Sequence, residues 1–194
     1  MKKKIILGSS SKFRKSLLST LDIEFDCISP NIDESRLSDE KPKDMAIRLA
    51  IEKAKKICNQ NSNAIIISSD ACAYCDGRIL GKPMTEDNAI EYLNFISQKT
   101  IYFYTSICVL DSSSQNYEID CAKYEIKIKK LSQENIINYV KLHQPLNSSA
   151  AFRYEVAKDI LIDKFIDTEN DISGLIGLPL KKLQKMLKKY KIKC

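Results

Sequence analysis

Histidine and glycine are scarce in this sequence and tryptophan is absent. The single histidine, His143, excludes a zinc site built from several histidines. The five glycines are far fewer than the roughly fourteen that average usage would give. No G-x-x-x-x-G-K-[ST] loop occurs, which excludes a Walker-type phosphate site. Long apolar runs are also missing, since nothing approaches the ~18 residues of a membrane span.

The residues that are present have the composition of an ordinary globular protein. With 44% hydrophobic and 29% charged residues, wholesale disorder is excluded. A chain of 194 residues predicts one domain over 1–194, or two lobes that share a core. The seven cysteines are scattered, and the C-x-x-C pair at 72–75 lacks the second pair of a zinc site. The apolar run after the first lysines ends at Gly8, too early for a secretory signal, so we expect a cytoplasmic protein.

Positive charge is concentrated near the C-terminal end. The net charge is +6, and the seven lysines of 181–194 account for more than all of it, leaving −1 on the rest of the chain. This segment also carries Leu183, Met186, Leu187 and Tyr190. Their spacing is typical of a helix that packs one face on a core. We therefore favour a solvated basic helix face, and we expect neither specific nucleic-acid binding nor a membrane partner.

The order of the apolar segments predicts an α/β fold. Strands are expected at 5–7, 25–28, 64–67, about 100–110 and 117–128, and the third is apolar on both faces and hence central. Helices are expected after the caps at 9–11, from Pro42, after Thr85 and after Ser132. In the first helix, the residues expected to face inward are Phe13, Leu17, Leu18 and Leu21. Asp76-Gly77 marks a tight turn.

The serine-rich segment before the first helix, 8–15, has two interpretations. A helix that opens directly after a buried strand points backbone N–H groups and hydroxyls at one place, where the helix dipole favours an anion. Arg14 and Lys15 add positive charge in the first turns. The same pattern also fits simple helix capping.

Asp70 follows the buried stretch 65–69 and is the most suggestive acidic residue. A carboxylate at the carboxyl end of a central strand lies where ligands bind in α/β sheets, although it also fits a loop cap. Lys82, between Gly81 and Pro83, could reach the same cleft. Glu34 and Lys53 are ambiguous by pattern alone.

Segments in the same order over nearly the whole chain resemble the Maf family of nucleotide pyrophosphatases. These segments are 7–15, 33–34, 52–54, 69–70 with 76–83, 151–155 and 174–180. The resemblance implies a twisted mixed sheet flanked by helices, similar to inosine triphosphatases, with two lobes around a central cleft and usually a homodimer. It also implies hydrolysis of a nucleoside triphosphate to the monophosphate and pyrophosphate with a divalent cation.

Carried over residue by residue, the resemblance makes Asp70 the proton acceptor and Glu34 the second acidic group. The phosphate side would be formed by Ser10, Arg14, Lys15, Lys53 and Lys82, with Glu34 beside them. Phosphoryl chemistry needs positioning, cations around the developing charge and a base that orients water. We therefore expect Asp70 to activate water against the α-phosphorus. Mg²⁺ or Mn²⁺ would be shared between carboxylates, Asp70 and Glu34, and phosphate oxygens.

The segment Phe152-Arg153-Tyr154-Glu155 looks like the Maf branch that acts on 7-methyl-GTP, and Phe13 fits that branch as well. The dTTP/UTP branch has Gln at position 155 and Arg at position 13. A methylated guanine is cationic, so an aromatic face and a carboxylate suit it. We expect removal of this modified nucleotide before it is incorporated. The alternatives are a dTTP/UTP pyrophosphatase and a non-enzymatic cell-division regulator or nucleic-acid binder that uses the basic end.

Two positions depart clearly from the family pattern, and Arg153, where the family usually has Lys, and Lys158, where glycine-rich sequence is common, depart more mildly. Lys12 stands where the family usually has proline, and Ala71 stands where the nearest branch has a polar glutamine that determines specificity. Loss of that amide removes one hydrogen bond to a base edge, worth about 1 kcal/mol. Substrate choice is therefore less constrained by the sequence than activity.

Overall fold

The computed structural model describes residues 3–168 and 170–192. They form two compact units. Unit 1 comprises the described residues of Met1–Ala71, Thr105–Ala122 and Asp171–Cys194, and unit 2 comprises those of Cys72–Tyr104 and Lys123–Asn170. Among the helices of these residues, none combines the length and the hydrophobicity that crossing a membrane requires.

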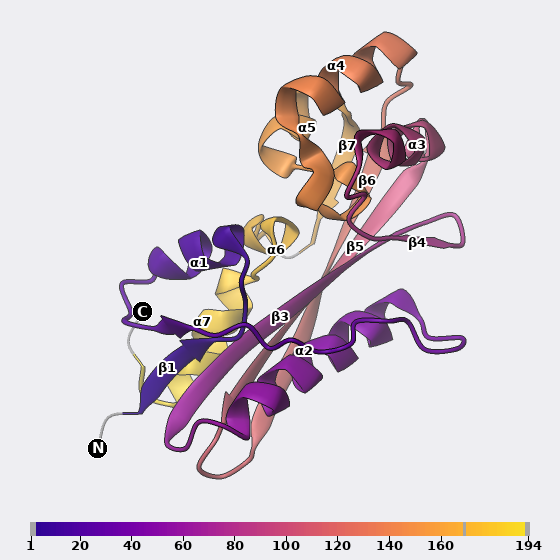
Figure 1. The fold of residues 1–194 in the computed structure, drawn as a ribbon. Helices are drawn as coiled ribbons and strands as arrows, with labels where there is room; N and C mark the ends of the chain where they lie inside the picture. Colours follow the sequence, from indigo (N-terminus) through magenta and orange to yellow (C-terminus); the bar gives the residue numbers. More distant parts are fainter. Residues whose placement is uncertain (1–2, 169, 193–194) are drawn as a thin grey trace. The chain divides into compact units, whose positions relative to one another are not determined.

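Seven strands in the described part of the chain form one mixed sheet in the order β2-β1-β3-β5-β6-β7, with β4 paired to β3 (Figure 1). The strands are β1 (Lys4–Leu7), β2 (Asp26–Cys27), β3 (Ala64–Cys75), β4 (Arg78–Leu80), β5 (Thr100–Asp111), β6 (Tyr117–Ile128) and β7 (Ile162–Asp167). β1 is parallel to β2 and β3, whereas β4 runs antiparallel to β3 and β7 antiparallel to β6. The predicted α/β class with a mixed sheet is confirmed.

Four helices begin where the sequence predicts them, after the caps at 9–11, at Pro42, after Thr85 and after Ser132, whereas two short helices within 154–176 were not predicted. The helices are α1 (Lys12–Ser19), α2 (Pro42–Cys58), α3 (Glu86–Ile96), α4 (Gln133–His143), α5 (Tyr154–Ile160), α6 (Ser173–Ile176) and α7 (Leu180–Lys189), with 3-10 turns η1 (Pro145–Asn147) and η2 (Ser149–Ala151). The hydroxyls of Ser11, Thr85 and Ser132 each accept a hydrogen bond from the backbone N–H three residues later. Pro42 occupies the first turn of α2, where its missing N–H has no consequence.

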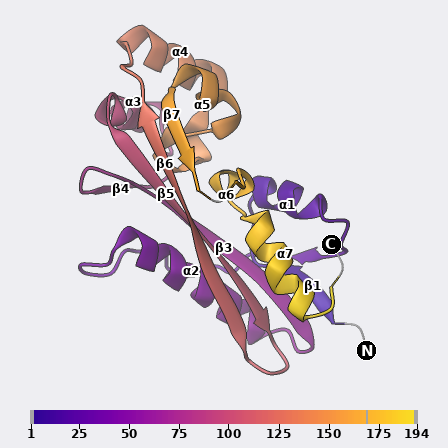
Figure 2. The ribbon, with the colours of Figure 1, turned by 180° about the vertical axis from the view of Figure 1, so that it is seen from behind.

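Alternation along the strands gives unit 1 a core on each face of the sheet. Odd-numbered residues of β1 and β3 pack with α1 and α7, and even-numbered residues pack with α2. The first cluster includes Ile5, Leu7, Ile65, Ile67, Leu18 and Leu187, and the second includes Ile6, Ile66, Ala50, Ala54 and Ile57. Figures 1 and 2 show α2 on one side of these strands and α1 and α7 on the other. Both faces of β3 are therefore covered, so its polar residues need partners inside the protein.

The prediction of a basic helix docked by its apolar face is confirmed for α7. Leu183, Met186 and Leu187 are buried. Two of the lysines form ion pairs with β6, Lys182 with Asp120 at 3.0 Å and Lys189 with Glu118 at 2.8 Å. The lysines at 181, 185, 188 and 191 are exposed.

Two local predictions are wrong. Phe13 was expected to face inward, but it is 40% exposed, whereas Leu18 and Leu21 are buried. Phe13 and Leu18 are five residues apart, which separates them by roughly 140° around a helix, so one face cannot bury both.

The second error concerns the end of β3. The apolar pattern predicts that the strand ends at Asp70, but β3 continues to Cys75. Ser68 and Ser69 do not end the strand, because their hydroxyls are hydrogen-bonded inside the protein. The turn after Cys75 is confirmed: Asp76 and Gly77 have φ of +48° and +85°, and they connect β3 to β4.

Gly8 provides a test of this packing. A Cβ at Gly8 would lie 2.8 Å from Cδ1 of the buried Ile57 and 3.5 Å from the carbonyl oxygen of Ile67. We expect Gly8→Ala to lower the free energy of unfolding by about 1–3 kcal/mol, because the filled core must shift. Gly81→Ala is the control, since a Cβ there meets nothing within 4 Å. Chemical denaturation should show a loss for Gly8→Ala only, and equal stability of the two variants would contradict the packing.

Candidate active site

A buried lysine bridges two carboxylates in unit 1. Nζ of Lys53 on α2 lies 2.5 Å from Oδ1 of Asp70 on β3 and 2.7 Å from Oε1 of Glu34, in the segment between β2 and α2. Lys53 and Asp70 are 5% and 8% exposed, whereas the Glu34 side chain is 56% exposed. One end of this charged cluster is thus enclosed by protein and the other faces solvent.

Periodicity explains why Lys53 and Asp70 meet. The buried apolar positions of α2 are Ala46, Leu49, Ala50, Ala54 and Ile57. Lys53 has helical spacing from Leu49 and Ala50, so it lies on the same buried face. On β3, Asp70 shares its face with Ile66 and Ser68, and the Ser68 hydroxyl donates to the Ala50 carbonyl of α2. A lysine on that face must find a charged partner, and Asp70 is in place to provide it.

Ser106 on β5 holds the backbone around Asp70. Its hydroxyl oxygen accepts a hydrogen bond from the Asp70 N–H at 3.2 Å and donates to the Ala46 carbonyl of α2 at 2.6 Å. A single buried hydroxyl therefore links the strand that carries Asp70 to the helix that carries Lys53.

The opposite face of β3 connects to Arg14 of α1. The Gly177 carbonyl accepts a hydrogen bond from Nε of Arg14 at 2.9 Å and lies 2.9 Å from the Ser69 hydroxyl. The same hydroxyl donates to the Ser106 carbonyl at 2.6 Å. Gly177 has φ of +131°, a conformation that only glycine adopts without strain.

Burial dominates the electrostatics of the cluster. It raises the pKa of the Asp70 carboxyl above its usual value, although Lys53 and Arg14 act against it, and Glu34 adds to the rise. Burial also lowers the pKa of the Arg14 guanidinium, which Asp70 and Glu34 partly offset. Arginine stays charged nonetheless. The site therefore holds a strengthened carboxylate base beside two cations.

Two of the three serines before α1 accept hydrogen bonds from nearby backbone N–H groups. The Ser9 hydroxyl accepts from the Ser11 N–H, and the Ser11 hydroxyl accepts from the Arg14 N–H. The capping interpretation is therefore confirmed for Ser11. Ser10 and Lys15 are exposed, and their contact with phosphate stays a prediction.

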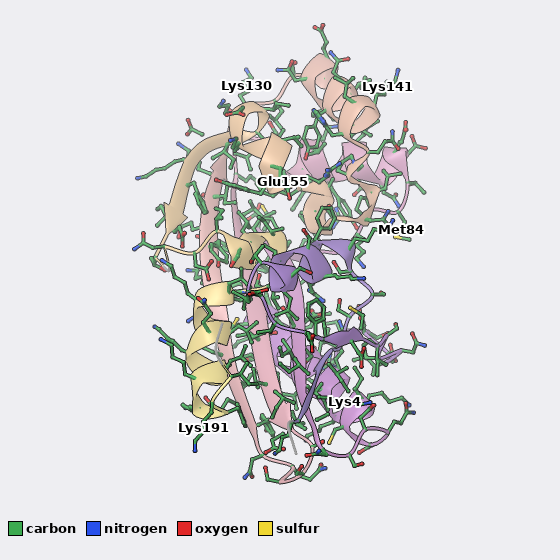
Figure 3. All side chains as sticks on the ribbon, turned by 90° about the vertical axis from the view of Figure 1, so that its left-hand side faces the viewer. Lys4, Met84, Lys130, Lys141, Glu155 and Lys191 are labelled. Carbon is green, nitrogen blue, oxygen red and sulfur yellow. The ribbon has the colours of Figure 1, made fainter. Side chains whose placement is uncertain are left out.

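The remaining predicted residues lie elsewhere. Ala71 is half-buried on β3, and alternation turns it to the face opposite Asp70. Lys82, after β4, and Glu155, in the first turn of α5, belong to unit 2 and are exposed there. Figure 3 shows the Glu155 side chain. The structure thus brings Arg14, Glu34, Lys53 and Asp70 together, and their roles stay predictions.

Unit 2 fixes the segment that precedes Glu155. The Tyr139 hydroxyl of α4 donates to the Ala151 carbonyl and accepts from the Arg153 N–H. Nη1 of Arg153 donates to the His143 carbonyl at 2.7 Å. Burial raises the pKa of Tyr139 to about 12, so its hydroxyl keeps the proton that this bond requires.

Sequence reasoning missed the supporting roles of Ser69, Ser106 and the Gly177 carbonyl. The signal was weak but present, because Thr105-Ser106 interrupts an otherwise apolar stretch of β5 with two buried hydroxyls. Buried polar groups usually need partners. The Ser106 hydroxyl finds them in the Asp70 N–H and the Ala46 carbonyl, whereas Oγ1 of Thr105 has no hydrogen-bond partner among the described residues.

The carboxylates of Asp70 and Glu34 fit a hard divalent cation only if a bound phosphate supplies further oxygen atoms. In residues 3–168 and 170–192, no group of three or more His, Cys, Asp or Glu side chains is arranged to hold a metal. Asp70 and Glu34 both contact Lys53, so their carboxylates lie close together. Magnesium is commonly held by one or two carboxylates together with substrate phosphates and waters.

Two solved structures define the fold class. A HAM1 protein from Coxiella burnetii matches with a TM-score of 0.51 at 17% identity, over 96% of this chain and 99% of that one. The Ham1 protein from Staphylococcus aureus matches with a TM-score of 0.53 at 14% identity, over 97% and 100%. The chain therefore has a Ham1-like α/β fold.

The family follows from sequence comparison. The model of the Maf-like protein family matches residues 4–190, and the chain belongs to the Maf family. Proteins named 7-methyl-GTP pyrophosphatase are similar to it. The one from Colwellia psychrerythraea is 42% identical over 98% of this chain and 94% of its own length, and the one from Idiomarina loihiensis is 38% identical over 97% and 95%. The predicted resemblance to Maf proteins is confirmed.

The raised pKa of Asp70 predicts how stability depends on pH. Folding favours the protonated carboxyl, so its stabilising contribution is complete below the unfolded pKa of about 3.9 and is lost as pH rises through the higher folded value. The asparagine of Asp70→Asn does not titrate, so only the unmodified protein loses this contribution. The free energy of unfolding of Asp70→Asn, minus that of the unmodified protein, should therefore increase between the two pKa values and stay constant at higher pH. Urea denaturation at a series of pH values measures this difference.

Asp111 is the control with the opposite sign. Burial acts to raise its pKa, but hydrogen bonds from Lys3 and Ser113 lower it overall. Its contribution is present above the unfolded pKa and lost as pH falls through the lower folded value. The corresponding difference for Asp111→Asn should therefore decrease as pH rises. The same trend in both variants would contradict the assignment of Asp70.

Proposed function

We propose that this protein is a nucleoside triphosphate pyrophosphatase that hydrolyses 7-methyl-GTP to 7-methyl-GMP and pyrophosphate, and so removes a modified nucleotide before its incorporation. The observation that carries the proposal is the bridge from Lys53 to Asp70 and Glu34. It lies within the span over which relatives named 7-methyl-GTP pyrophosphatase match. The homodimer and the cytoplasmic location that the family resemblance implies stay predictions.

In this mechanism Asp70 acts as the general base. Its carboxylate accepts a proton from a water molecule as the water oxygen bonds to the α-phosphorus. The bond from the α-phosphorus to the oxygen that bridges to the β-phosphorus breaks, and that oxygen leaves on pyrophosphate. The raised pKa of Asp70 supports this role, because a carboxyl nearer to neutral pKa is a better proton acceptor.

The cations around Asp70 would hold the phosphates. Lys53 is held on Asp70 by direct contact and Arg14 is held by its hydrogen bond to the Gly177 carbonyl, so little reorganisation is needed as negative charge develops. Ser10, Lys15 and Lys82 would contribute from the exposed surface. Their charges and hydroxyls suit oxygen atoms of a triphosphate.

Asp70 and Glu34 would hold the divalent cation together with phosphate oxygens. When bound, Mg²⁺ or Mn²⁺ neutralises charge on the phosphates and orients them. The two carboxylates supply the oxygen donors that such cations prefer. Lys53 keeps these carboxylates close together, which supports this choice of ligands.

The base would be selected by charge and by stacking. The 7-methylguanine ring is cationic, so an exposed carboxylate such as Glu155 and an exposed aromatic ring such as Phe13 both suit it. Ala71 offers no hydrogen bond to the base, in contrast to the glutamine of the nearest branch.

A nucleotide panel tests the function. We expect pyrophosphate release to be fastest with 7-methyl-GTP among 7-methyl-GTP, GTP, dTTP and UTP, to require Mg²⁺ or Mn²⁺ and to stop with EDTA. Asp70→Asn should lower kcat by at least about 100-fold, because the general base is lost. Asp111→Asn, which removes an aspartate outside the cluster, should retain turnover.

Each contrary result has a distinct meaning. Preference for dTTP and UTP would establish the alternative pyrophosphatase. Full turnover by Asp70→Asn would refute the mechanism. No hydrolysis of any of the four nucleotides would contradict the proposed activity and favour a non-enzymatic role.

Glu155 provides a test of base selection. We expect Glu155→Gln to reduce the preference for 7-methyl-GTP over GTP in kcat/KM by about tenfold, because a negative partner for the cationic base is lost. Glu134→Gln is the matched control, since Glu134 is also exposed in the first turn of a unit 2 helix. If both variants keep the preference of the unmodified protein, Glu155 does not read the base.

A further inference from the structure

Glu34 reaches the charged cluster from a segment without helix or strand. Between Cys27 and Pro42 the backbone has no regular structure, and the Glu34 side chain is more than half exposed. A side chain on such a segment is held in place only if its backbone is fixed by other contacts. The contacts that fix it come from α2.

Arg48 of α2 binds this segment through Nε and Nη2 of its guanidinium group. Nε lies 2.6 Å from Oε1 of Glu40 and Nη2 lies 2.9 Å from Oε2, a two-point contact with one carboxylate. Nη2 also donates to the carbonyl oxygen of Ser35 at 3.0 Å, and Nη1 donates to Glu52 at 3.1 Å. Ser35 is the residue directly after Glu34.

Glu40 forms hydrogen bonds with other residues of the same segment. Its side chain is 8% exposed, and Oε2 accepts from the Leu37 N–H at 3.2 Å. Its carbonyl oxygen accepts from Nε and Nη2 of Arg36 at 3.0 and 2.8 Å. The Glu40 N–H in turn donates to the Leu37 carbonyl. Residues 35–40 therefore form a hydrogen-bonded loop. The Arg48 side chain connects this loop to α2 through Glu40 and Ser35.

One helix thus holds Glu34 in two ways. Lys53 contacts its carboxylate, and Arg48 contacts the carbonyl oxygen of the following residue. Both side chains project from α2, whose core face is packed against the sheet. We propose that Arg48 is a positioning residue for the reaction, which fixes the loop so that Glu34 stays on Lys53 and close to Asp70. The effect on turnover rests on the proposed function, whereas the effect on the loop does not.

Hydrogen exchange and kinetics together test this proposal. Arg48→Lys keeps the charge but loses the planar fork that binds Glu40 and Ser35 together. We expect the amides of Ser35, Leu37 and Glu40 to exchange at least about tenfold faster, with no change in β3. In the same variant kcat for the nucleotide should fall by about 10- to 100-fold, as misplacement of a reacting group predicts.

A double variant separates positioning from a general structural effect. If Arg48 acts through Glu34, Arg48→Lys should cause no further loss of kcat in a Glu34→Gln background. Losses that multiply would overturn the proposal, and so would unchanged exchange at 35–40. Glu40→Gln removes the other half of the fork and should reproduce both results, which keeps the test decisive if Arg48→Lys does not fold.

A control variant completes the test, and the exchange rates separate the positioning role from the proposed function. Arg78→Lys changes an exposed arginine whose Nη1 contacts Glu91 in unit 2, and it should leave exchange at 35–40 and turnover unchanged. If the unmodified protein hydrolyses no nucleotide, the proposed function fails. The exchange rates of residues 35–40 then decide whether Arg48 fixes the loop.

Discussion

The rest of unit 1 is organised around the burial of the Lys53 ammonium between two carboxylates. Removing ions from water costs several kcal/mol each, and attraction repays this only when the geometry is good. Contacts around the cluster supply that geometry: Ser106 joins β3 to α2, and Arg48 joins α2 to the loop of Glu34. Loss of one partner would leave a buried charge uncompensated, which typically costs about 3–5 kcal/mol.

The same arrangement suits phosphate chemistry. The two cations and the two carboxylates of the cluster balance in charge. Groups held in this way need little rearrangement when charge develops on a substrate, which is the main way in which proteins accelerate phosphoryl transfer. A protein that carries such a cluster gives up some stability for it, as the raised pKa of Asp70 indicates.

Local signals predicted much of the fold, whereas the site depended on contacts that local signals do not contain. Helix caps such as Ser11 and Thr85 bind the backbone N–H three residues later, so they could be predicted from the local sequence. Lys53 could have been identified as buried, because it falls within the apolar stripe of α2. The extent of β3 was missed, since partners of Ser69 lie 37 and 108 residues away. The short elements of 145–179 show no periodicity long enough to predict them. The position of Glu34 was also inaccessible, because it depends on side-chain hydrogen bonds from another element.

The Gly177 carbonyl has a consequence for the order in which the protein becomes functional. Arg14 and Gly177 are separated by 163 residues, yet they share a hydrogen bond. Synthesis proceeds from the N-terminus, and domains generally fold as units once their chain is available. A nascent chain that has not reached Gly177 contains Asp70, Lys53 and Glu34 but lacks the acceptor that holds Arg14. The hydrogen bond that holds Arg14 can therefore form only after nearly the whole chain has been synthesised.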